Sequence, residues 1–373
     1  MGSNCRKGSE VILKIAMIGH KYVPSREGGV EIVVEELSSR LAKENEVTLF
    51  NRKRKQYEKI NEHKGCKVKS IFTINKKSLD AIVYAFFATI KGVFGKYDVL
   101  HFHAEGPCYF LWMTKFCKKK IIVTIHGLDW QRGKWGGFAS KILKAGEKRA
   151  VKYADEIIVL SKNNQKYFMD TYGRETVYLP NGIGSPVKKE ADIITKEYGL
   201  KENDYILFLA RIVPEKGLDY LIEAYKNMTK EERMGKKLVI AGGSSHSDDY
   251  YNSIIEKCKG DEDIILTGFI TGDKLYEAFT NTCLYVLPSD IEGMPMSLLE
   301  AMSYGKRCLV SNIPENVEVI NERCVSFEKS NPKDLKEKLV AMLKEENSDG
   351  LETAIMTWDD VALKTNDLYK GVK

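Results

Sequence analysis

The stretch SDIEGMPMSLLEAMSYG, residues 289–305, places two carboxylates, Glu292 and Glu300, among apolar and small residues. A carboxylate in such surroundings costs free energy unless a partner binds it. Pro295 suits the first position of a helix, which predicts a helix N-terminus at this point. The residues at that N-terminus would be Gly293, Met294, Pro295 and Met296. Free backbone N–H groups and the positive end of the helix dipole favour a phosphate or a sugar hydroxyl there.

The two glutamates have different expected places. Glu300 would fall in the second turn of the helix, where a carboxylate can bind the vicinal hydroxyls of a ribose. Glu292 would lie just ahead of the helix, where it can bind a hydroxyl of a sugar. The alternative is that Glu300 is an ordinary surface residue and that Glu292 caps the helix.

Short β-rich runs alternate with longer amphipathic segments along almost the whole chain. The expected strands are Val11–Gly19, Glu46–Asn51, Val68–Thr73, Tyr97–Phe102, Lys120–His126, Glu156–Leu160, Val177–Leu179, Tyr205–Ala210, Lys237–Ala241, Ile264–Leu266, Cys283–Leu287, Arg307–Val310 and Val325–Phe327. This alternation is typical of right-handed βαβ units. A chain of 373 residues is too long for one ordinary core. We therefore expect an α/β protein with two doubly wound, parallel-sheet (Rossmann-like) domains.

The two halves of the chain carry opposite charge. Residues 1–185 contain 33 Lys and Arg against 18 Asp and Glu, whereas the remainder contains 25 against 34. Pro180–Val187, rich in Pro, Gly and Ser, falls at this change and is the expected hinge. A basic first half fits nucleic acid, an anionic membrane surface or an anionic substrate, but no nucleic-acid-binding motif accompanies it. Eight cysteines without a CxxC pair indicate reduced thiols in a cytoplasmic protein.

One apolar segment, Leu79–Gly95, has two interpretations. Its unbroken apolar core, residues 81–90, is about half the length of a membrane span, so it does not cross a bilayer. A helix buried against the sheet is the first interpretation. The second is an interfacial helix that rests on lipid, which the basic character of this half supports.

Two more features of the back half suit a nucleotide diphosphate. LARIVPEKG, residues 209–217, places Arg211 at a strand end and Lys216 in the next turn. An Arg fork and a Lys point charge together suit a pyrophosphate, although two basic residues in a solvated loop would look the same. Gly242 and Gly243 directly follow another strand and would let a backbone approach phosphate, or form an everyday turn.

Each of these three features follows its own strand, and in this order they resemble the retaining glycosyltransferases of family 4, which have the two-domain GT-B fold. The resemblance extends to the front half through GGVE, with Gly28 and Gly29 entering a helix, and HGLDW, with His126 at a strand end. It covers essentially the whole chain. It implies an acceptor-side domain at 1–183, a nucleotide-sugar domain at 184–355 and a C-terminal helix at 356–373, including Trp358, that crosses back onto the first domain.

The resemblance also implies a mechanism without a metal or other cofactor. A nucleotide diphosphate sugar, UDP- or dTDP-linked, would bind through Arg211, Lys216 and Glu300. Glu292 would hold the transferred sugar, and His126 would touch the sugar or its leaving phosphate. The charge that develops on the diphosphate would be stabilised by the two cations and the helix N-terminus. Asp261-Glu262-Asp263 has the letters of a metal motif but precedes a strand, and we interpret it as a solvated turn.

Some front-half residues have open assignments. Glu31 either orients the acceptor or is an acidic residue favoured by the helix dipole. His101 and His103 would face one way in a strand. We expect His101 in the core and His103 at the rim of the cleft, on the acceptor side. With His126 they could instead form a three-histidine zinc site.

The expected protein is thus a cytoplasmic glycosyltransferase that moves a sugar onto a glycan or a lipid-diphosphate-linked saccharide. The stretch around HGLDW looks like that of bacterial enzymes that build capsular or other surface polysaccharides, which implies a position on the inner face of the plasma membrane. The rivals are a GT-B epimerase or phosphorylase and a catalytically silent sugar-nucleotide-binding protein. A dehydrogenase is disfavoured, because no Gly-x-Gly-x-x-Gly opens a βαβ unit near the first strand.

Overall fold

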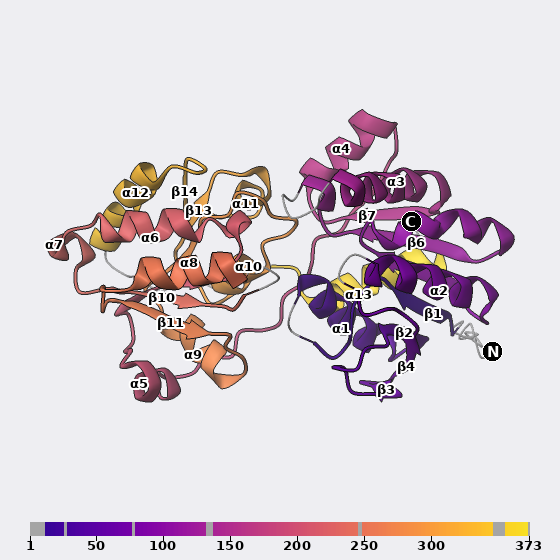
Figure 1. The fold of residues 1–373 in the computed structure, drawn as a ribbon, viewed down its shortest axis with the longest axis horizontal. Coiled ribbons are helices and arrows are strands. Elements are labelled where there is room, and N and C mark those ends of the chain that lie inside the picture. Colours follow the sequence, from indigo (N-terminus) through magenta and orange to yellow (C-terminus); the bar gives the residue numbers. More distant parts are fainter. Residues whose placement is uncertain are drawn as a thin grey trace, which may run out of the picture. The chain divides into compact units, whose positions relative to one another are not determined.

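The computed structural model describes residues 12–25, 28–76, 79–131, 137–244, 248–345 and 355–371. The chain forms two compact units (Figure 1). Unit 1 comprises Met1–Leu160, Asn164–Pro180 and Trp358–Lys373, and unit 2 comprises Ser161–Asn163 and Asn181–Thr357. Each unit is an α/β sandwich built on its own sheet, which confirms the fold class expected from the alternating pattern.

The sheet of unit 1 has the strand order β3-β4-β2-β1-β5-β6-β7-β8. Its strands are β1 (Lys14–Ile18), β2 (Glu46–Arg52), β3 (Glu62–His63), β4 (Cys66–Ile71), β5 (Val99–His103), β6 (Lys120–Ile125), β7 (Glu156–Val159) and β8 (Val177–Tyr178). All neighbours pair in parallel except β3, which runs antiparallel to β4 at the edge. The sequence does not predict β3, because two polar residues carry no strand signal of their own.

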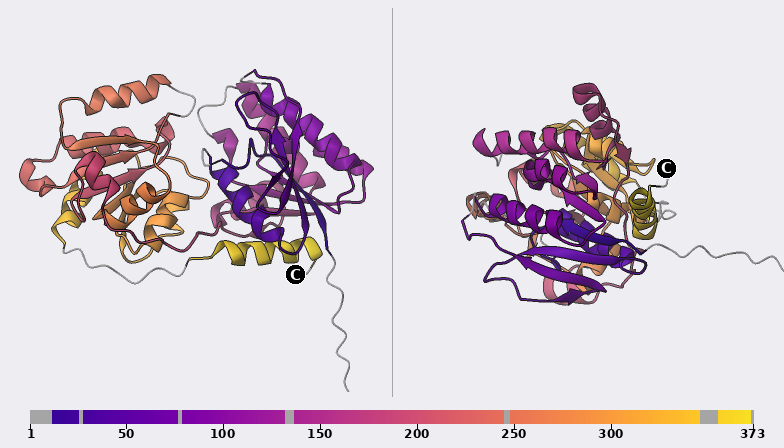
Figure 2. Two further views of the ribbon diagram at one scale, coloured as in Figure 1. Left: turned by 90° about the horizontal axis from the view of Figure 1, so that it is seen from below. Right: turned by 90° about the vertical axis from the view of Figure 1, so that its right-hand side faces the viewer.

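Helices cover both faces of this sheet. The helical segments are α1 (Gly29–Leu41), α2 (Asp80–Phe94), η1 (Pro107–Phe116), η2 (Asp129–Gln131), α3 (Gly137–Tyr153), α4 (Lys162–Tyr172) and α13 (Trp358–Lys370). On one face, Ala16 and Ile18 of β1 join a core with α2, η1, α3 and α4. The terminal helix α13 lies beside α1 (Figure 2), where Arg40 binds Asp359 at 3.0 Å and Asn45 binds Asn366 at 3.0 Å.

The sheet of unit 2 is parallel throughout its described strands, in the order β11-β10-β9-β12-β13-β14. Its strands are β9 (Tyr205–Leu209), β10 (Lys237–Ala241), β11 (Ile264–Gly268), β12 (Leu284–Leu287), β13 (Cys308–Ser311) and β14 (Cys324–Phe327). Each expected strand is found in the two sheets, apart from Val11, which lies outside the described residues.

Helices also cover both faces of the second sheet. They are α5 (Ile193–Tyr198), η3 (Pro214–Lys216), α6 (Leu218–Lys226), α7 (Lys230–Arg233), α8 (Asp248–Cys258), α9 (Asp273–Asn281), α10 (Met296–Ser303), α11 (Pro314–Val317) and α12 (Pro332–Lys344). One core packs α6, α8 and α12 on the sheet, and the other packs α5, α9 and α10 on the opposite face. The two segments that lead out of this unit are paired, since the Ile183 N–H donates to Met356 O at 3.1 Å and Ile183 bridges Thr357.

Candidate functional site

The strand order of unit 2 reverses between β9 and β12. The chain first adds β10 and β11 on one side of β9 and then β12, β13 and β14 on the other. Ligands of open α/β sheets bind beyond the carboxyl ends of the strands at such a reversal. Arg211 follows β9, Gly242 follows β10 and Glu292 follows β12, so the three sequence features meet at one edge of the sheet.

The loop that carries Lys216 is fastened to the loop after β12. Gly217 closes the turn with φ = +64°, and a Cβ at this position would lie 2.0 Å from Pro288 O. Only glycine allows this approach, because any side chain would collide with backbone. The Asp290 N–H also donates to Glu215 O at 2.9 Å. The two loops therefore hold Lys216 close to the Glu292 side of the sheet edge.

Lys216 and Glu292 form a direct ion pair. Lys216 Nζ lies 2.5 Å from Glu292 Oε1, and the side chains are 15% and 6% exposed. Ser289 Oγ donates a second hydrogen bond to the same carboxylate oxygen at 2.7 Å. These contacts offset the cost of withdrawing the carboxylate from water. The residue that precedes α10 directly is Pro295 and no side chain caps the helix, so the alternative that Glu292 is a helix cap is wrong.

Helix α10 begins at Met296, one residue later than expected. Pro295 precedes the helix with φ = −79° and ψ = 77° instead of forming its first residue. The Met296 N–H donates to Met294 O at 2.9 Å. This amide already has a partner, so the expectation that it is free to bind a phosphate or a sugar hydroxyl is wrong. Glu300 opens the second turn, as the sequence predicts.

The glycine pair after β10 has two different structural roles. Gly242 adopts φ = +156°, and a Cβ there would lie 1.9 Å from Ala210 O. Its N–H donates to Gly268 O at 2.9 Å, while Gly243 O accepts the Ile212 N–H at 3.0 Å. A Cβ on Gly243 would meet only Phe269 Cβ, at 3.9 Å. A glycine is thus needed at position 242 for backbone packing. The open space beside the glycine pair, which a ligand could approach, lies at Gly243.

Three residues that the sequence reasoning missed support this edge of the sheet. Ser289 holds the Glu292 carboxylate, and Tyr285 OH donates to Ser297 Oγ at 2.7 Å, which ties β12 to α10. Both Ser289 and Ser297 lie in the quoted stretch, but a serine in a loop or a helix start has no signal that distinguishes it from a solvated one. Asp261 and Asp263 bind Arg233 at 2.9 and 3.2 Å, so these acids form an ion-paired turn and not a metal motif.

In unit 1, histidines gather near the carboxyl ends of the central strands. His101 and His103 of β5 stack with ring centroids 4.2 Å apart, as expected for residues on one face of a strand. His101 is fully buried, which confirms its core position. His103 is also fully buried, so its expected place at a cleft rim is wrong. The reason is that β5 lies between β1 and β6 in the middle of the sheet. Its two histidines contact side chains of those strands and of α13, namely Met17, Thr124, His126 and Tyr369.

The ring nitrogens of these histidines bind protein groups. His101 Nδ1 lies 2.6 Å from Tyr369 OH and Nε2 lies 2.7 Å from Thr124 Oγ1. His103 Nδ1 lies 3.1 Å from His126 Nε2. Across the described residues, no group of three or more His, Cys, Asp or Glu side chains is placed to hold a metal ion. The geometry of this cluster therefore gives the three-histidine zinc alternative no support.

The loop between β1 and α1 contains the glycines expected to meet a ligand. Gly28 precedes α1, and a Cβ there would lie 2.2 Å from Glu31 Oε2. A Cβ on Gly29 would meet nothing within 4 Å. Glu31 lies in the first turn of α1 and is 6% exposed, and its Oε1 accepts the Lys21 N–H at 3.0 Å. Glu31 therefore fastens the β1–α1 loop.

Helix α2 shows features of both interpretations of its segment. One side packs on the sheet through buried residues that include Tyr84, Ala88 and Val93. The other side exposes Phe86, Phe87 and Phe94, the last with 78% of its surface. None of the described helices has both the length and the apolarity to cross a membrane.

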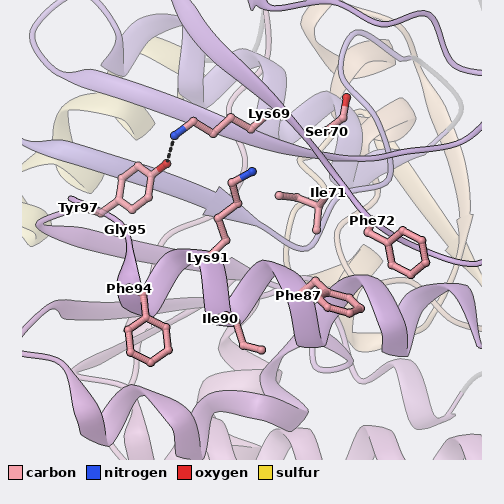
Figure 3. A pocket seen from close by; sticks show the side chains of 10 residues that line it. All are labelled: Lys69, Ser70, Ile71, Phe72, Phe87, Ile90, Lys91, Phe94, Gly95 and Tyr97. Atoms are coloured by element: carbon pink, nitrogen blue, oxygen red, sulfur yellow. Dashed lines mark hydrogen bonds between the residues drawn. The ribbon is translucent and has the colours of Figure 1, made fainter.

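A groove of about 600 Å³ lies between the exposed side of α2 and the end of β4 (Figure 3). Its lining residues are Lys69, Ser70, Ile71, Phe72, Phe87, Ile90, Lys91, Phe94, Gly95 and Tyr97. Phe72 and Phe87 meet edge to face with centroids 5.3 Å apart, and Lys69 Nζ donates to Tyr97 OH at 3.0 Å. The lining contains two lysines and no acid, and burial beside Lys69 lowers the pKa of Lys91.

Comparisons with known proteins identify glycosyltransferases as relatives of this chain. Residues 27–184 match the family model for glycosyltransferase family 4, and residues 190–353 match the model for glycosyl transferases group 1. An uncharacterized glycosyltransferase of Methanocaldococcus jannaschii is 27% identical over 83% of this chain and 83% of its own length. A UDP-Gal:alpha-D-GlcNAc-diphosphoundecaprenol alpha-1,3-galactosyltransferase of Escherichia coli is 25% identical over 59% of each chain.

Solved structures share the fold at low sequence identity. HepE of Anabaena, crystallised with UDP and glucose, superposes with a TM-score of 0.79 at 14% identity and covers 96% of this chain and 100% of its own. WaaG, a glycosyltransferase involved in lipopolysaccharide biosynthesis, gives a TM-score of 0.74 at 15% identity, with 96% and 100% coverage. Because the two family models together match most of the chain and both units have the parallel-sheet architecture of these neighbours, the protein belongs to the family 4 type of GT-B glycosyltransferases.

Proposed function

We propose that the protein transfers a sugar, with retention of anomeric configuration, from a UDP- or dTDP-linked donor to a glycan or lipid-linked saccharide. The observation that carries this proposal is the meeting of Arg211, Lys216 and Glu292 at the strand-order reversal of unit 2. HepE was crystallised with UDP, and the Escherichia coli relative is named for a UDP-sugar donor, which supports a uridine nucleotide. Relatives named for O-antigen biosynthesis support a role in polysaccharide assembly.

The proposed roles follow the chemistry of each group. Arg211 and Lys216 bind the diphosphate, and Glu300 binds the ribose hydroxyls. Glu292 holds a hydroxyl of the transferred sugar, and His126 contacts that sugar or its leaving phosphate. Backbone approaches the donor at Gly28 and Gly29, at Gly243, and at Gly293, Met294 and Pro295 ahead of α10.

The ion pair with Glu292 gives Lys216 two roles. Lys216 neutralises the Glu292 carboxylate, and a donor diphosphate would give it a second anionic partner. As the sugar–phosphate bond breaks, negative charge grows on the diphosphate, and fixed cations stabilise that charge more than they stabilise the ground state. The departing phosphate oxygen takes the proton of the acceptor hydroxyl, so no separate protein base is required.

The reaction is proposed to need no metal ion or other cofactor. Two cations supply the charge stabilisation that a divalent ion would otherwise supply. Transfer should therefore persist at an unchanged rate when a chelator is added in excess. Loss of transfer that Mg²⁺ or Mn²⁺ restores would overturn this part of the proposal.

The acceptor is proposed to be lipid-linked, with the protein acting in the cytoplasm at the inner face of an anionic membrane. The support is the exposed side of α2 with its groove, where phenylalanines stand beside Lys69 and Lys91 (Figure 3). Exposed apolar patches of this kind mark interaction sites, and lysines beside them favour anionic headgroups.

Sedimentation with vesicles tests the membrane contact. We expect binding to vesicles of phosphatidylglycerol and phosphatidylcholine, and little binding to phosphatidylcholine alone. Phe94→Ser should weaken binding about 10- to 100-fold, since withdrawing a phenylalanine from an apolar phase costs about 1.5–3 kcal/mol. Phe269→Ser, at a residue of unit 2 that is 61% exposed, is the matched control and should have no effect. Equal loss in both variants, or no anionic preference, would contradict the contact.

Product analysis tests the reaction itself. The protein is incubated with UDP- and dTDP-sugars and a lipid-diphosphate-linked saccharide, and the anomeric configuration of the product is read by NMR. An α-linked product from an α-linked donor is expected. A β-linked product would exclude retention. Conversion of the donor sugar without an acceptor, or to a sugar phosphate, would favour the epimerase or phosphorylase alternatives, and no turnover with intact nucleotide binding would favour a silent binding protein.

A further inference from the structure

His103 contacts two different acceptor-capable groups in the core of unit 1. Its Nδ1 lies 3.1 Å from His126 Nε2, and its Nε2 lies 3.5 Å from Met17 Sδ of β1. Rotating the ring by half a turn would place carbon atoms against both partners, so this orientation is the one that satisfies both nitrogens. His103 therefore links the core strand β1 to His126 at the end of β6.

The His103 ring carries a single proton at neutral pH. It is fully buried, and burial lowers its pKa well below 6.5, with the nearby rings of His101, His126 and His20 acting in the same direction. A neutral imidazole has one N–H donor and one bare acceptor nitrogen. The place of that one proton decides which partner His103 donates to.

The contact with Met17 determines which ring nitrogen of His103 carries the proton. A thioether sulfur has no hydrogen and can only accept. If His103 Nε2 were bare, two lone pairs would face each other at Met17, whereas an Nε2–H gives a favourable contact. The proton therefore belongs on Nε2, which leaves Nδ1 as the acceptor. His126 Nε2 must then be the donor in the bond between the two histidines.

We propose that His103 is a positioning residue which, through Met17, makes His126 Nε2 the donor, so that the neutral form of His126 is the Nε2–H tautomer with Nδ1 as its accepting nitrogen. In that tautomer any group bound at His126 Nδ1 must donate a hydrogen. A sugar hydroxyl can do so and an ionised phosphate cannot. The consequence for catalysis rests on the proposed function and assigns His126 to the sugar and not to the leaving phosphate. The tautomer itself does not depend on that function.

Long-range ¹H–¹⁵N NMR of protein labelled in histidine tests the assignment without any substrate, because protonated and bare ring nitrogens resonate far apart. Signals are assigned with His103→Gln and His126→Gln. At a pH where both rings are in their neutral form we expect a protonated Nε2 and a bare Nδ1 on each. A bare Nε2 on His126, or two protonated nitrogens on His103, would overturn the proposal whatever the enzyme transfers.

Met17→Leu tests the origin of the tautomer, since leucine fills the space without an acceptor. We expect the two His126 nitrogen signals to move toward each other as the tautomers mix. Met228→Leu, a buried substitution in unit 2, should leave them in place. Unchanged His126 signals in Met17→Leu would refute the role of the sulfur. If that variant does not fold, the wild-type spectrum still decides the tautomer.

Discussion

Replacing Glu292 by glutamine should separate nucleotide binding from sugar transfer. Glu292 Oε1 lies 2.5 Å from Lys216 Nζ and forms an ion pair with it. A diphosphate that reached Lys216 would lie about 5 Å from this carboxylate, and two unit charges at that distance repel by about 1–3 kcal/mol for an effective dielectric between those of water and the protein surface. Glutamine removes the repulsion and keeps the oxygen that accepts from Ser289.

We therefore expect Glu292→Gln to bind free UDP or dTDP about 5- to 150-fold more tightly than wild type, with the gain shrinking as salt is added. Turnover should fall, because the sugar loses its carboxylate partner. Isothermal titration with the free nucleotide measures the first effect. Asp290→Asn is the matched control, since that carboxylate is held by Tyr220 and Ser330 at 3.0 and 2.7 Å. Unchanged or weaker nucleotide binding in Glu292→Gln would refute the assignment of Lys216 to the diphosphate.

Three further outcomes are expected. Glu300→Ala should weaken nucleotide binding about 10- to 100-fold, since a charged hydrogen-bond acceptor contributes about 1.5–3 kcal/mol, and titration calorimetry would disprove this by finding equal affinity. Gly242→Ala should lower the free energy of unfolding by about 2–4 kcal/mol in urea, whereas Gly243→Ala should change it little. Burial and the nearby carboxyls of Asp129 and Glu147 raise the pKa of Glu105 far above its usual 4.5. The unfolded chain therefore ionises Glu105 first, and folding stability is lost as pH rises above 4.5 by up to about 1.4 kcal/mol per pH unit. Glu105→Gln should gain stability over wild type from pH 5 to pH 8, and a difference that is independent of pH would contradict this.

Most strands of the two sheets can be predicted from the sequence, because each is a short apolar run between longer amphipathic segments. The edge strand β3 cannot be predicted in this way, since its pairing with β4 depends on the turn between them and not on its own residues. Helix α10 begins one residue later than the sequence predicts, because proline is compatible with both the first helical position and the extended residue before it.

Within the candidate site, residue types were predictable but their pairings were not. Lys216 and Glu292 are 76 residues apart, and only the reversal of strand order between β9 and β12 brings them together. The burial of His103 likewise follows from the central place of β5 in the sheet, which the alternation of two histidines along a strand does not specify. The periodicity of apolar residues predicts which face of a single helix or strand is buried. Contacts between loops depend instead on the order of the strands in the sheet.

Thermal unfolding of the pure protein against UDP, dTDP, GDP and ADP, with chelator present throughout, tests the central claim most directly. A ligand that binds only the folded state adds about 2.7 kcal/mol of stability at a hundred times its Kd. We predict that UDP or dTDP raises the midpoint, that the other bases do not, and that Lys216→Met and Arg211→Met abolish the shift. A protein whose midpoint responds to none of the four nucleotides, or responds equally after both substitutions, would contradict a nucleotide diphosphate site at the carboxyl edge of unit 2.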